Sequence, residues 1–240
     1  MGRLTEISFA GVDEKTDISE LQRLQAMDPR VEFGILLFEN WEEKGNHCHN
    51  PGKLERFRDS GLNLCAHLCG LIACAAKQNN WEPAMEFADL SLFTRVQLNL
   101  AKFPSTEREE LSITLPEPIK EVIIQQNAAY DCGLFYRWWL SHRNDTSISV
   151  LLDGSHGKGK SSDIIPLANI PKVGYAGGMG PDNIYEKTAR LLCDPAVYNF
   201  WVAMESGVRT DGWFDVAKAE AVIETVHKAE FMEKYVIMSC

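Results

Sequence analysis

The sequence predicts an α/β protein built as one (β/α)₈ barrel, with residues 1–240 forming a single domain. Three observations predict this fold class. Short apolar runs alternate with helical patterns along the chain, as βα units around a parallel sheet do. Eight such units follow one another in order. A length of 240 residues with 45% hydrophobic content is typical of one barrel with a sizeable core.

Each apolar run marks an expected strand. The second run, VEFGILLF, is almost entirely apolar, as a strand buried on both faces should be. The strands are expected at Leu4–Gly11, Val31–Phe38, Asn63–Gly70, Thr94–Leu100, Glu121–Ala128, Ser147–Asp153, Lys172–Gly177 and Phe200–Ser206.

The helices of the first half follow from capping residues and periodicity. The first helix is expected to begin at Asp17, because Asp17 and Glu20 form an acidic variant of the capping box. A long polar loop after the second strand leads to a short helix that Gly61 ends. Pro83 suits the first turn of a helix that runs to about residue 92, and residues 71–78 are a candidate for a further helical turn.

The second half offers similar signals. Ser105 is a candidate cap for the helix after the fourth strand, and Asp131 starts the helix after the fifth. Trp138 and Trp139 lie on that helix, where we interpret them as core or oligomer contacts rather than a ligand shelf. The last helix is expected to start at Asp215.

The charge and the cysteine content restrict the partners and the cellular compartment that we expect for this protein. A formal net charge of -10 repels nucleic acid and anionic membrane, so we expect neither as a partner. Local donors must therefore hold any anionic small molecule. Seven cysteines without a paired spacing imply no disulfide framework, and no apolar run follows Met1, so we expect a cytoplasmic protein.

The neighbours His47, Cys48 and His49 are a possible metal-binding group. They lie in a segment rich in Glu, Lys and Asn, and no second pair of ligands with a matching spacing accompanies them. We therefore interpret the segment as a solvated loop and expect neither a metal nor another cofactor.

The carboxyl ends of the strands define the functional shortlist, because barrels of this kind carry their chemistry at that mouth. His67 and Cys69 are two residues apart, so both side chains should point to the same side of their strand. The polar residues at these ends are Asp13, Glu39, His67, Cys69, Gln97, Asn99, Gln126, Asn127, Asp153 and Glu205.

Three glycine-bearing segments fall in the last three βα loops. They are GKGK at Gly157–Lys160, AGGMGPDN at Ala176–Asn183 and ESGVR at Glu205–Arg209. Glycine lets backbone amides approach an anion, and a helix N-terminus adds unpaired N–H groups. The loops after the seventh and eighth strands are the usual phosphate site of barrels, so we expect a phosphorylated small-molecule ligand there rather than tight turns alone.

These segments resemble those of the phosphoribosylanthranilate isomerases, enzymes of tryptophan biosynthesis. LLD at Leu151–Asp153 with the following GKGKSSD resembles that family's LLD and GSGKTFD. AGGMGPDN resembles AGGLNPDN, ESGVR resembles SSGVE, and VQLNL at Val96–Leu100 is similar to VQLHG. The matches cover roughly half of the chain, in the correct order.

The resemblance implies a reaction and a set of site residues. An N-linked phosphoribosyl group would become an open-chain aminoketose through acid-assisted ring opening and proton abstraction from the sugar. Asp153 matches the family's acid, although it could instead cap the glycine loop. Gln97 and Asn99 would bind substrate. The phosphate would be bound by Gly159, Gly177, Gly178, Ser206 and Gly207.

The base of the family does not match. Its first strand ends KICG, with the cysteine as base, whereas this chain reads SFAG and places Ala10 there. Alanine cannot accept a proton. The loop after the second strand also lacks the family's arginine for the anthranilate carboxylate, and Asn99 replaces a histidine. The candidate catalytic residues beside Asp153 are therefore Asp13 and Cys69, with His67 and Glu205 as further possibilities.

Three functions stay open at this point. The first is an isomerase with an altered substrate or base. The second, suggested by Ala10, is a non-catalytic phosphosugar-binding barrel. The third is another reaction class, such as an epimerase or aldolase, on the same phosphate-binding barrel, and the fold cannot choose among them.

Overall fold

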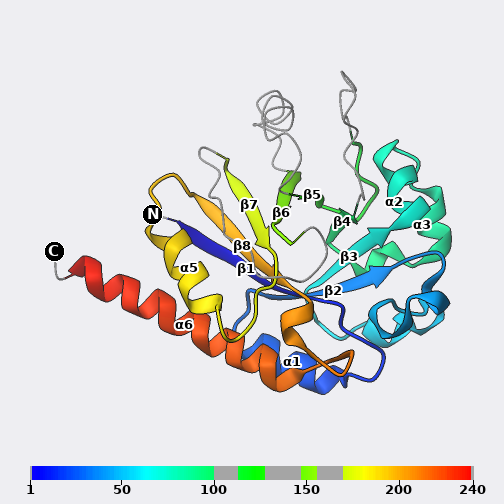
Figure 1. Cartoon of the computed structure of the whole chain (residues 1–240). Helices are drawn as coiled ribbons and strands as arrows, with labels where there is room; N and C mark the ends of the chain where they lie inside the picture. Colours follow the sequence, from blue (N-terminus) through cyan, green and yellow to red (C-terminus); the bar gives the residue numbers. More distant parts are fainter. Residues whose placement is uncertain (1, 100–112, 128–146, 156–169, 239–240) are drawn as a thin grey trace.

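The computed structural model describes residues 2–99, 113–127, 147–155 and 170–238. Within them, eight parallel strands pair in chain order and close into a barrel, so the predicted (β/α)₈, or TIM-barrel, fold is confirmed (Figure 1). The strands are β1 (Arg3–Ala10), β2 (Val31–Leu37), β3 (Leu64–Cys69), β4 (Arg95–Asn99), β5 (Glu121–Asn127), β6 (Ile148–Asp153), β7 (Lys172–Ala176) and β8 (Asn199–Met204).

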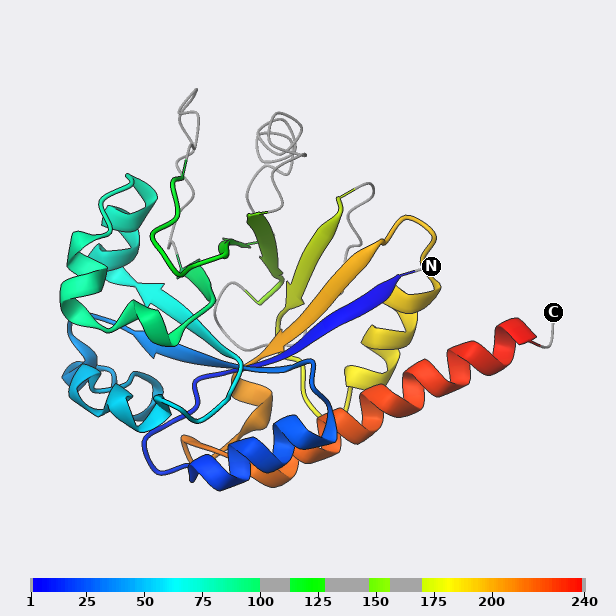
Figure 2. The same cartoon turned by 180° about the vertical axis from the view of Figure 1, so that it is seen from behind.

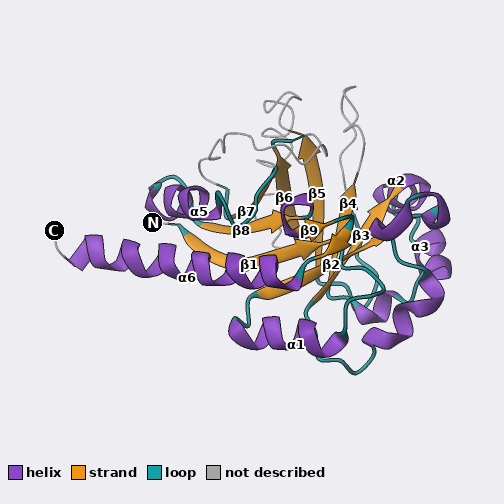
Figure 3. Ribbon diagram, turned by 60° about the horizontal axis from the view of Figure 1, so that its bottom comes forward, coloured by secondary structure: helices purple, strands orange, loops and turns teal. Residues whose placement is uncertain are grey.

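Helices cover the outside of this barrel. On one side α6 (Val216–Met238) contacts both α1 (Ile18–Met27) and α5 (Ile184–Cys193), and α2 (Gly70–Lys77) with α3 (Glu82–Phe87) covers another (Figures 2 and 3). The short elements are the 3₁₀ helices η1 (Trp41–Glu43), η2 (Gly45–His47), η3 (Pro51–Phe57), η4 (Leu90–Leu92) and η5 (Ser206–Val208), and the antiparallel pair β9 (Arg209–Thr210) and β10 (Trp213–Phe214). No helix in the described part of the chain has the length and apolar character that crossing a bilayer requires.

The two helix starts that fall on described residues are confirmed. The Asp17 carboxylate accepts a 2.8 Å hydrogen bond from the Ser19 amide, and Asp215 accepts one of 3.1 Å from the amide of Lys218. The reciprocal half of the capping box is absent from the described contacts of Glu20, which instead pairs with Arg23. The helices expected from Ser105 and Asp131, with Trp138 and Trp139, lie outside the described residues.

Three helix predictions were wrong in detail. The short helix expected before Gly61 is a series of 3₁₀ turns, because Gly45, Pro51 and Gly52 interrupt regular helix in this segment. After β3, residues 70–77 form a full helix rather than one turn. The helix that contains Pro83 stops at Phe87, since the Asp89 carboxylate then caps the separate turn η4.

Alternate residues of every strand point into the barrel, and an apolar layer fills its middle. Cys65, Ile123, Leu151, Trp201 and Ala203 form this layer. A β-carbon on Gly174 would collide with the ring of Trp201. The glycine on β7 therefore makes room for the large indole from β8.

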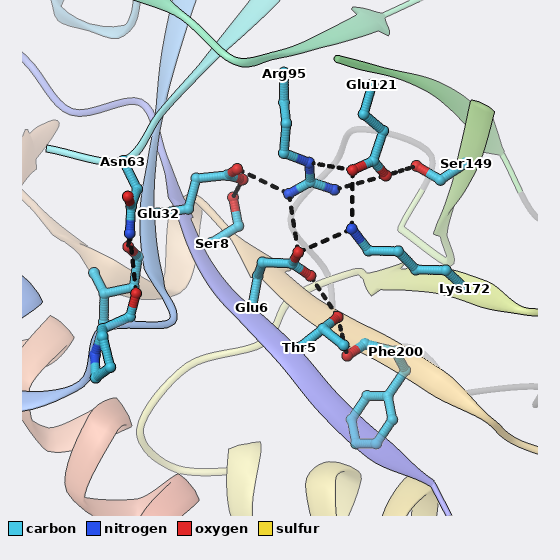
Figure 4. Close-up of polar contacts among 12 residues, drawn as sticks. Thr5, Glu6, Ser8, Glu32, Asn63, Arg95, Glu121, Ser149, Lys172 and Phe200 are labelled. Atoms are coloured by element: carbon cyan, nitrogen blue, oxygen red, sulfur yellow. Dashed lines mark hydrogen bonds and ion pairs between the residues drawn. The ribbon is translucent and has the colours of Figure 1, made fainter. Parts of the chain in front are cut away.

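The amino-terminal ends of the strands carry a charged layer, which we call the ionic floor: Glu6, Glu32, Arg95, Glu121 and Lys172 (Figure 4). Arg95 lies 2.8 Å from Glu32 and 2.9 Å from Glu121. Lys172 lies 2.8 Å from Glu6 and 2.9 Å from Glu121. Burial opposes ionisation, but Arg95 and Lys172 still hold the pKa of Glu121 below its ordinary value.

Replacement of Arg95 by methionine should strongly destabilise the barrel. Its loss leaves buried Glu32 without its cation and Glu121 with Lys172 alone, so we expect the free energy of unfolding to fall by about 3–5 kcal/mol. Urea unfolding measures the change. The matched control is Arg23→Met, which removes exposed ion pairs and should cost less than about 1 kcal/mol. Equal losses for the two variants would contradict a structural role for the floor.

Candidate functional site

The carboxyl ends of the strands form the mouth opposite the floor. Because inward and outward residues alternate, the side chains that face this end of the lumen can be assigned from the middle layer and the register of the strands. They are Ala10, Gly34, Leu36, His67, Cys69, Gln97, Asn99, Gln125, Asp153 and Glu205.

A chain of hydrogen-bonded side chains crosses the mouth from β3 to β6, and we call it the polar ladder: Cys69, Asn99, Gln97, Gln125 and Asp153. Asn99 Nδ2 lies 3.3 Å from the sulfur of Cys69, and its Oδ1 accepts a 2.7 Å bond from Gln97 Nε2. Gln97 Nε2 also lies 3.5 Å from Gln125 Oε1. Gln125 then donates to Asp153 at 3.2 Å. The ladder joins four of the predicted site residues, Cys69, Gln97, Asn99 and Asp153, into one surface.

Asp153 is held in one orientation at the end of the ladder. Its side chain is buried, and Oδ1 accepts hydrogen bonds from the amide and the hydroxyl of Ser155 at 2.9 and 2.7 Å. Oδ2 accepts the bond from Gln125. The carboxylate thus caps the loop after β6, as one sequence interpretation expected, and it also faces the mouth.

Asp13 lies in a different setting. Its Oδ1 accepts from the amide of Lys15 and the hydroxyl of Thr16, and its Oδ2 accepts a 2.6 Å bond from the amide of Phe214. Arg209 lies 3.9 Å from Asp13 and donates to the carbonyl of Gly11. Asp13 therefore ties the loop after β1 to the loop after β8, and it does not join the polar ladder.

The segment after β2 was interpreted as a solvated loop, and this was wrong for Cys48 and His49, whose side chains are buried. Cys48 bridges Leu36 in parallel register, beyond the point where β1 stops pairing with β2. The segment thereby continues the barrel wall above Ala10, and Ala10, Leu36 and Cys48 form an apolar cluster with Phe38 and Trp41 packed against it. Among the described residues, no group of three or more His, Cys, Asp or Glu could hold a metal ion.

The glycine-bearing loops after β7 and β8 touch each other backbone to backbone. We call residues 177–180 and 206–207 the glycine clamp. Gly177 and Gly178 have φ values of 121° and 57°, which favour glycine. A β-carbon on Gly207 would collide with the carbonyl oxygen of Met179. Asn183 fixes the first loop by donating 2.9 Å to the carbonyl of Gly178 and accepting 3.1 Å from the amide of Gly180.

The clamp has the donors that an anion requires. Over the residues that the structure describes, the amides of Gly177, Gly178 and Gly207 donate to no protein acceptor. Ser206 and Gly207 open the short helix η5, immediately after β8. Gly159, the fifth predicted phosphate ligand, lies outside the described residues.

The sequence reasoning missed Gln125 and named Gln126 instead; Asn127, which it also named, pairs in register with Asp153 at the end of β5. Gln126 pairs in register with Leu152 on the outer side of the sheet, whereas Gln125 shares the inward face with Glu121 and Ile123. The run EVIIQQN has an isoleucine and a glutamine on each face, so periodicity alone could not assign its inward side. Counting in twos from a floor residue such as Glu121 would have identified Gln125.

Several solved structures share the fold over nearly the whole chain, and three of them are described in turn. The TrpF protein of Jonesia denitrificans has a TM-score of 0.55 and 14% identity over 94% of this chain and 98% of its own. N-(5′-phosphoribosyl)anthranilate isomerase from Pyrococcus furiosus gives 0.57 and 16% over 93% and 99%. Phosphoribosyl anthranilate isomerase from Thermococcus kodakaraensis gives 0.53 and 15% over 92% and 98%. No protein-family model and no curated protein sequence matches the chain.

The buried imidazoles of His49 and His67 should lower the free energy of unfolding in mild acid. Burial lowers the pKa of both His49 and His67 to about 4, from 6.5 when exposed. Between these values the unfolded chain binds protons that the folded chain excludes, so stability decreases as the pH falls from about 6.5 to about 4. Each imidazole contributes a slope of up to about 1.4 kcal/mol per pH unit.

The variant His49→Gln isolates this contribution. Its unfolding free energy, measured in urea between pH 7 and pH 4.5, should depend less steeply on pH than that of the wild type. Phe57→Leu is the control, because it removes the ring that packs against His49 without removing a titrating group. It should lower stability and keep the slope. A slope unchanged by His49→Gln would contradict a neutral buried imidazole.

Proposed function

We propose that this chain is a phosphosugar isomerase resembling phosphoribosylanthranilate isomerase, with an altered substrate or base, and that residues 1–240 act as one domain. The observation that carries the proposal is the position of Asp153 and the glycine clamp on three adjacent strands, β6, β7 and β8. The Gly154 amide donates 3.1 Å to the carbonyl of Ala176, so the loop beside the carboxylate is joined to the loop of the clamp. The shared fold of the three solved structures supports the same conclusion.

In this proposal the glycine clamp binds the phosphate. Gly177, Gly178, Ser206 and Gly207 supply backbone amides, and Gly159 is proposed to add a further one from the loop after β6. Backbone donors suit this chain, because a net charge of -10 gives a phosphate no favourable long-range field. Amide groups at a helix start bind phosphate through short directed bonds and a local dipole.

Asp153 would protonate the ring oxygen of the sugar, and the rest of the polar ladder would bind its hydroxyl groups. Gln97 and Asn99 each present donor and acceptor atoms at the mouth, and Gln125 links them to Asp153. Opening the ring leaves a carbon–nitrogen double bond at the first sugar carbon. Loss of the proton on the second carbon then allows rearrangement to the ketose.

The altered part of the site lies along β1 and β2. Ala10 offers no base, and the apolar cluster of Ala10, Leu36 and Cys48 with Phe38 and Trp41 occupies that side of the mouth. We therefore propose that the non-phosphate half of the substrate differs from anthranilate. Among the four possible bases named from sequence, Asp13 is engaged by loop donors, and burial raises the pKa of Cys69 to about 12.

The alternative is a phosphosugar-binding barrel without catalytic activity. Ala10 is the observation that favours it, because an alanine cannot transfer a proton. This alternative keeps the glycine clamp and predicts binding of a sugar phosphate with no isomerisation.

The variant Asp153→Asn separates the two functions. The wild type should convert an N-aryl analogue of N-(5′-phosphoribosyl)anthranilate that lacks the anthranilate carboxylate, and the variant should lose about 10²–10⁴-fold in kcat, because an amide cannot donate the proton. Turnover is followed by absorbance or fluorescence of the aryl group. Exposed Asp59 provides the control, and Asp59→Asn should keep full activity. Turnover that survives in Asp153→Asn would remove the proposed acid, and binding without any wild-type turnover would support the alternative.

A further inference from the structure

One buried polar atom at the mouth is unexplained by the ladder, the clamp or the loop contacts. It is Nε2 of His67, on β3. The side chain is 3% exposed, and Nε2 has no hydrogen-bond partner among the described residues. An unsatisfied buried polar group costs about 1–3 kcal/mol. A native structure tolerates such a cost most readily where the atom has a partner during function.

The wall of the barrel is shaped around this nitrogen. Gly34 faces it from β2, and a β-carbon there would lie 2.6 Å from Nε2 and 2.7 Å from Cε1 of His67. The same β-carbon would lie 3.1 Å from the Cα of Ala10, so the two small residues pair side by side beneath the ring. Any larger residue at position 34 would displace the imidazole. His67 therefore occupies the part of the mouth next to Ala10, where the side chain of β1 offers no functional group.

The charges around His67 come from several elements. Glu205, which follows β8, acts on it from the mouth and favours a protonated ring, and Arg95 of the ionic floor opposes protonation from below. Glu205 lies against β1, since its Cγ would be 3.0 Å from a β-carbon on Gly11. The thiols of Cys48 and Cys69 also face this side of the mouth, and both lie within the field of Glu205.

These groups differ in their ability to accept a proton at neutral pH. Burial raises the pKa of the Cys48 thiol to about 11 and that of the Cys69 thiol to about 12, so both sulfurs stay protonated. Burial lowers the pKa of His67 to about 4, so its ring is neutral and one nitrogen carries a free lone pair. The carboxylate of Glu205 favours a proton on this ring electrostatically.

We propose that His67 is the base of the reaction, and that Glu205 stabilises the imidazolium that forms. The inference rests on the proposed function and completes it by naming the proton acceptor. β3 and β6 are three strands apart in the closed barrel, so a sugar in the mouth has Asp153 on one side and His67 on the other.

The proton balance closes with these two groups. In this mechanism Asp153 starts as the carboxylic acid and gives its proton to the ring oxygen as the nitrogen lone pair forms the C1=N bond and the ring C1–O bond breaks. His67 then takes the proton from C2, and the C–H electron pair forms C1=C2 while the C=N pair returns to nitrogen. Finally the imidazolium protonates C1, the carboxylate of Asp153 takes the proton of the C2 hydroxyl, and the C2 carbonyl forms. Both residues end in their starting states.

Chemical rescue tests this assignment on the full-length protein. The variant His67→Ala should bind the N-aryl analogue that the wild type converts with a nearly unchanged KM. Its kcat should fall by about 10²–10⁴-fold. Added imidazole should raise that kcat at least about tenfold, with a dependence on pH that follows the neutral form of the added base. A residue that only shapes the barrel would show no such rescue.

Two further variants distinguish the loss of a base from a folding defect. His67→Gln keeps a polar side chain of similar length without a base, and it should show the same loss of kcat. His49→Ala is the matched control, because His49 is also buried and has no hydrogen bond from either ring nitrogen among the described residues, yet it packs on Phe57 outside the lumen. It should keep its kcat and gain nothing from imidazole.

The outcomes separate the two proposals. Turnover by the wild type that survives within about threefold in both His67 variants, or a loss without imidazole rescue, overturns His67 as base and leaves the isomerase proposal standing. Absence of turnover by the wild type overturns the proposed function and the base assignment with it. Loss in both variants with rescue of His67→Ala supports both.

Discussion

The requirement that a closed barrel fill its own interior governs the rest of this structure. At the amino-terminal ends of the strands the filling is ionic, with Arg95 set between Glu32 and Glu121, and Lys172 between Glu6 and Glu121. Above it Trp201 and its apolar neighbours fill the middle layer. The floor has three carboxylates and two cations, which leaves a slight excess of negative charge. The buried Arg95 links two strands, because it pairs with Glu32 on β2 and with Glu121 on β5. With these two layers filled over the residues that the structure describes, the mouth is the end of the lumen where we propose that a ligand binds.

The mouth is accordingly divided by strand. The polar ladder extends over β3 to β6, the glycine clamp follows β7 and β8, and an apolar cluster covers β1 and β2. This division matches the parts of a sugar phosphate: backbone amides for the phosphate, amide and carboxyl side chains for the hydroxyls, and an apolar wall for the remaining group. Asp13 and Arg209 support the arrangement from outside the lumen, since they tie the loop after β1 to the loop after β8.

The alternation of elements could be predicted from the sequence because each buried strand is a dense apolar run. The helix caps Asp17 and Asp215 could be predicted as well. The sequence could not show which face of β5 points into the barrel, because both faces are buried. As a result, Gln126 was named in place of Gln125. The burial of Cys48 was beyond local reasoning, because it depends on pairing with Leu36 after β1 has turned away. Likewise Asp13 lies in the loop after β1, and besides its local partners Lys15 and Thr16 it accepts a hydrogen bond from Phe214, about two hundred positions later. Such long-range contacts leave no local signal in the sequence.

The central claim is that the mouth holds a phosphosugar between the glycine clamp and the polar ladder. A crystal structure of the protein soaked with a phosphoribosyl compound tests it most directly. The account predicts phosphate oxygens about 3 Å from the amides of Gly177, Gly178 and Gly207, with the sugar between Asp153 and His67. A phosphate bound away from these loops, or a sugar in contact with neither Asp153 nor His67, would contradict it.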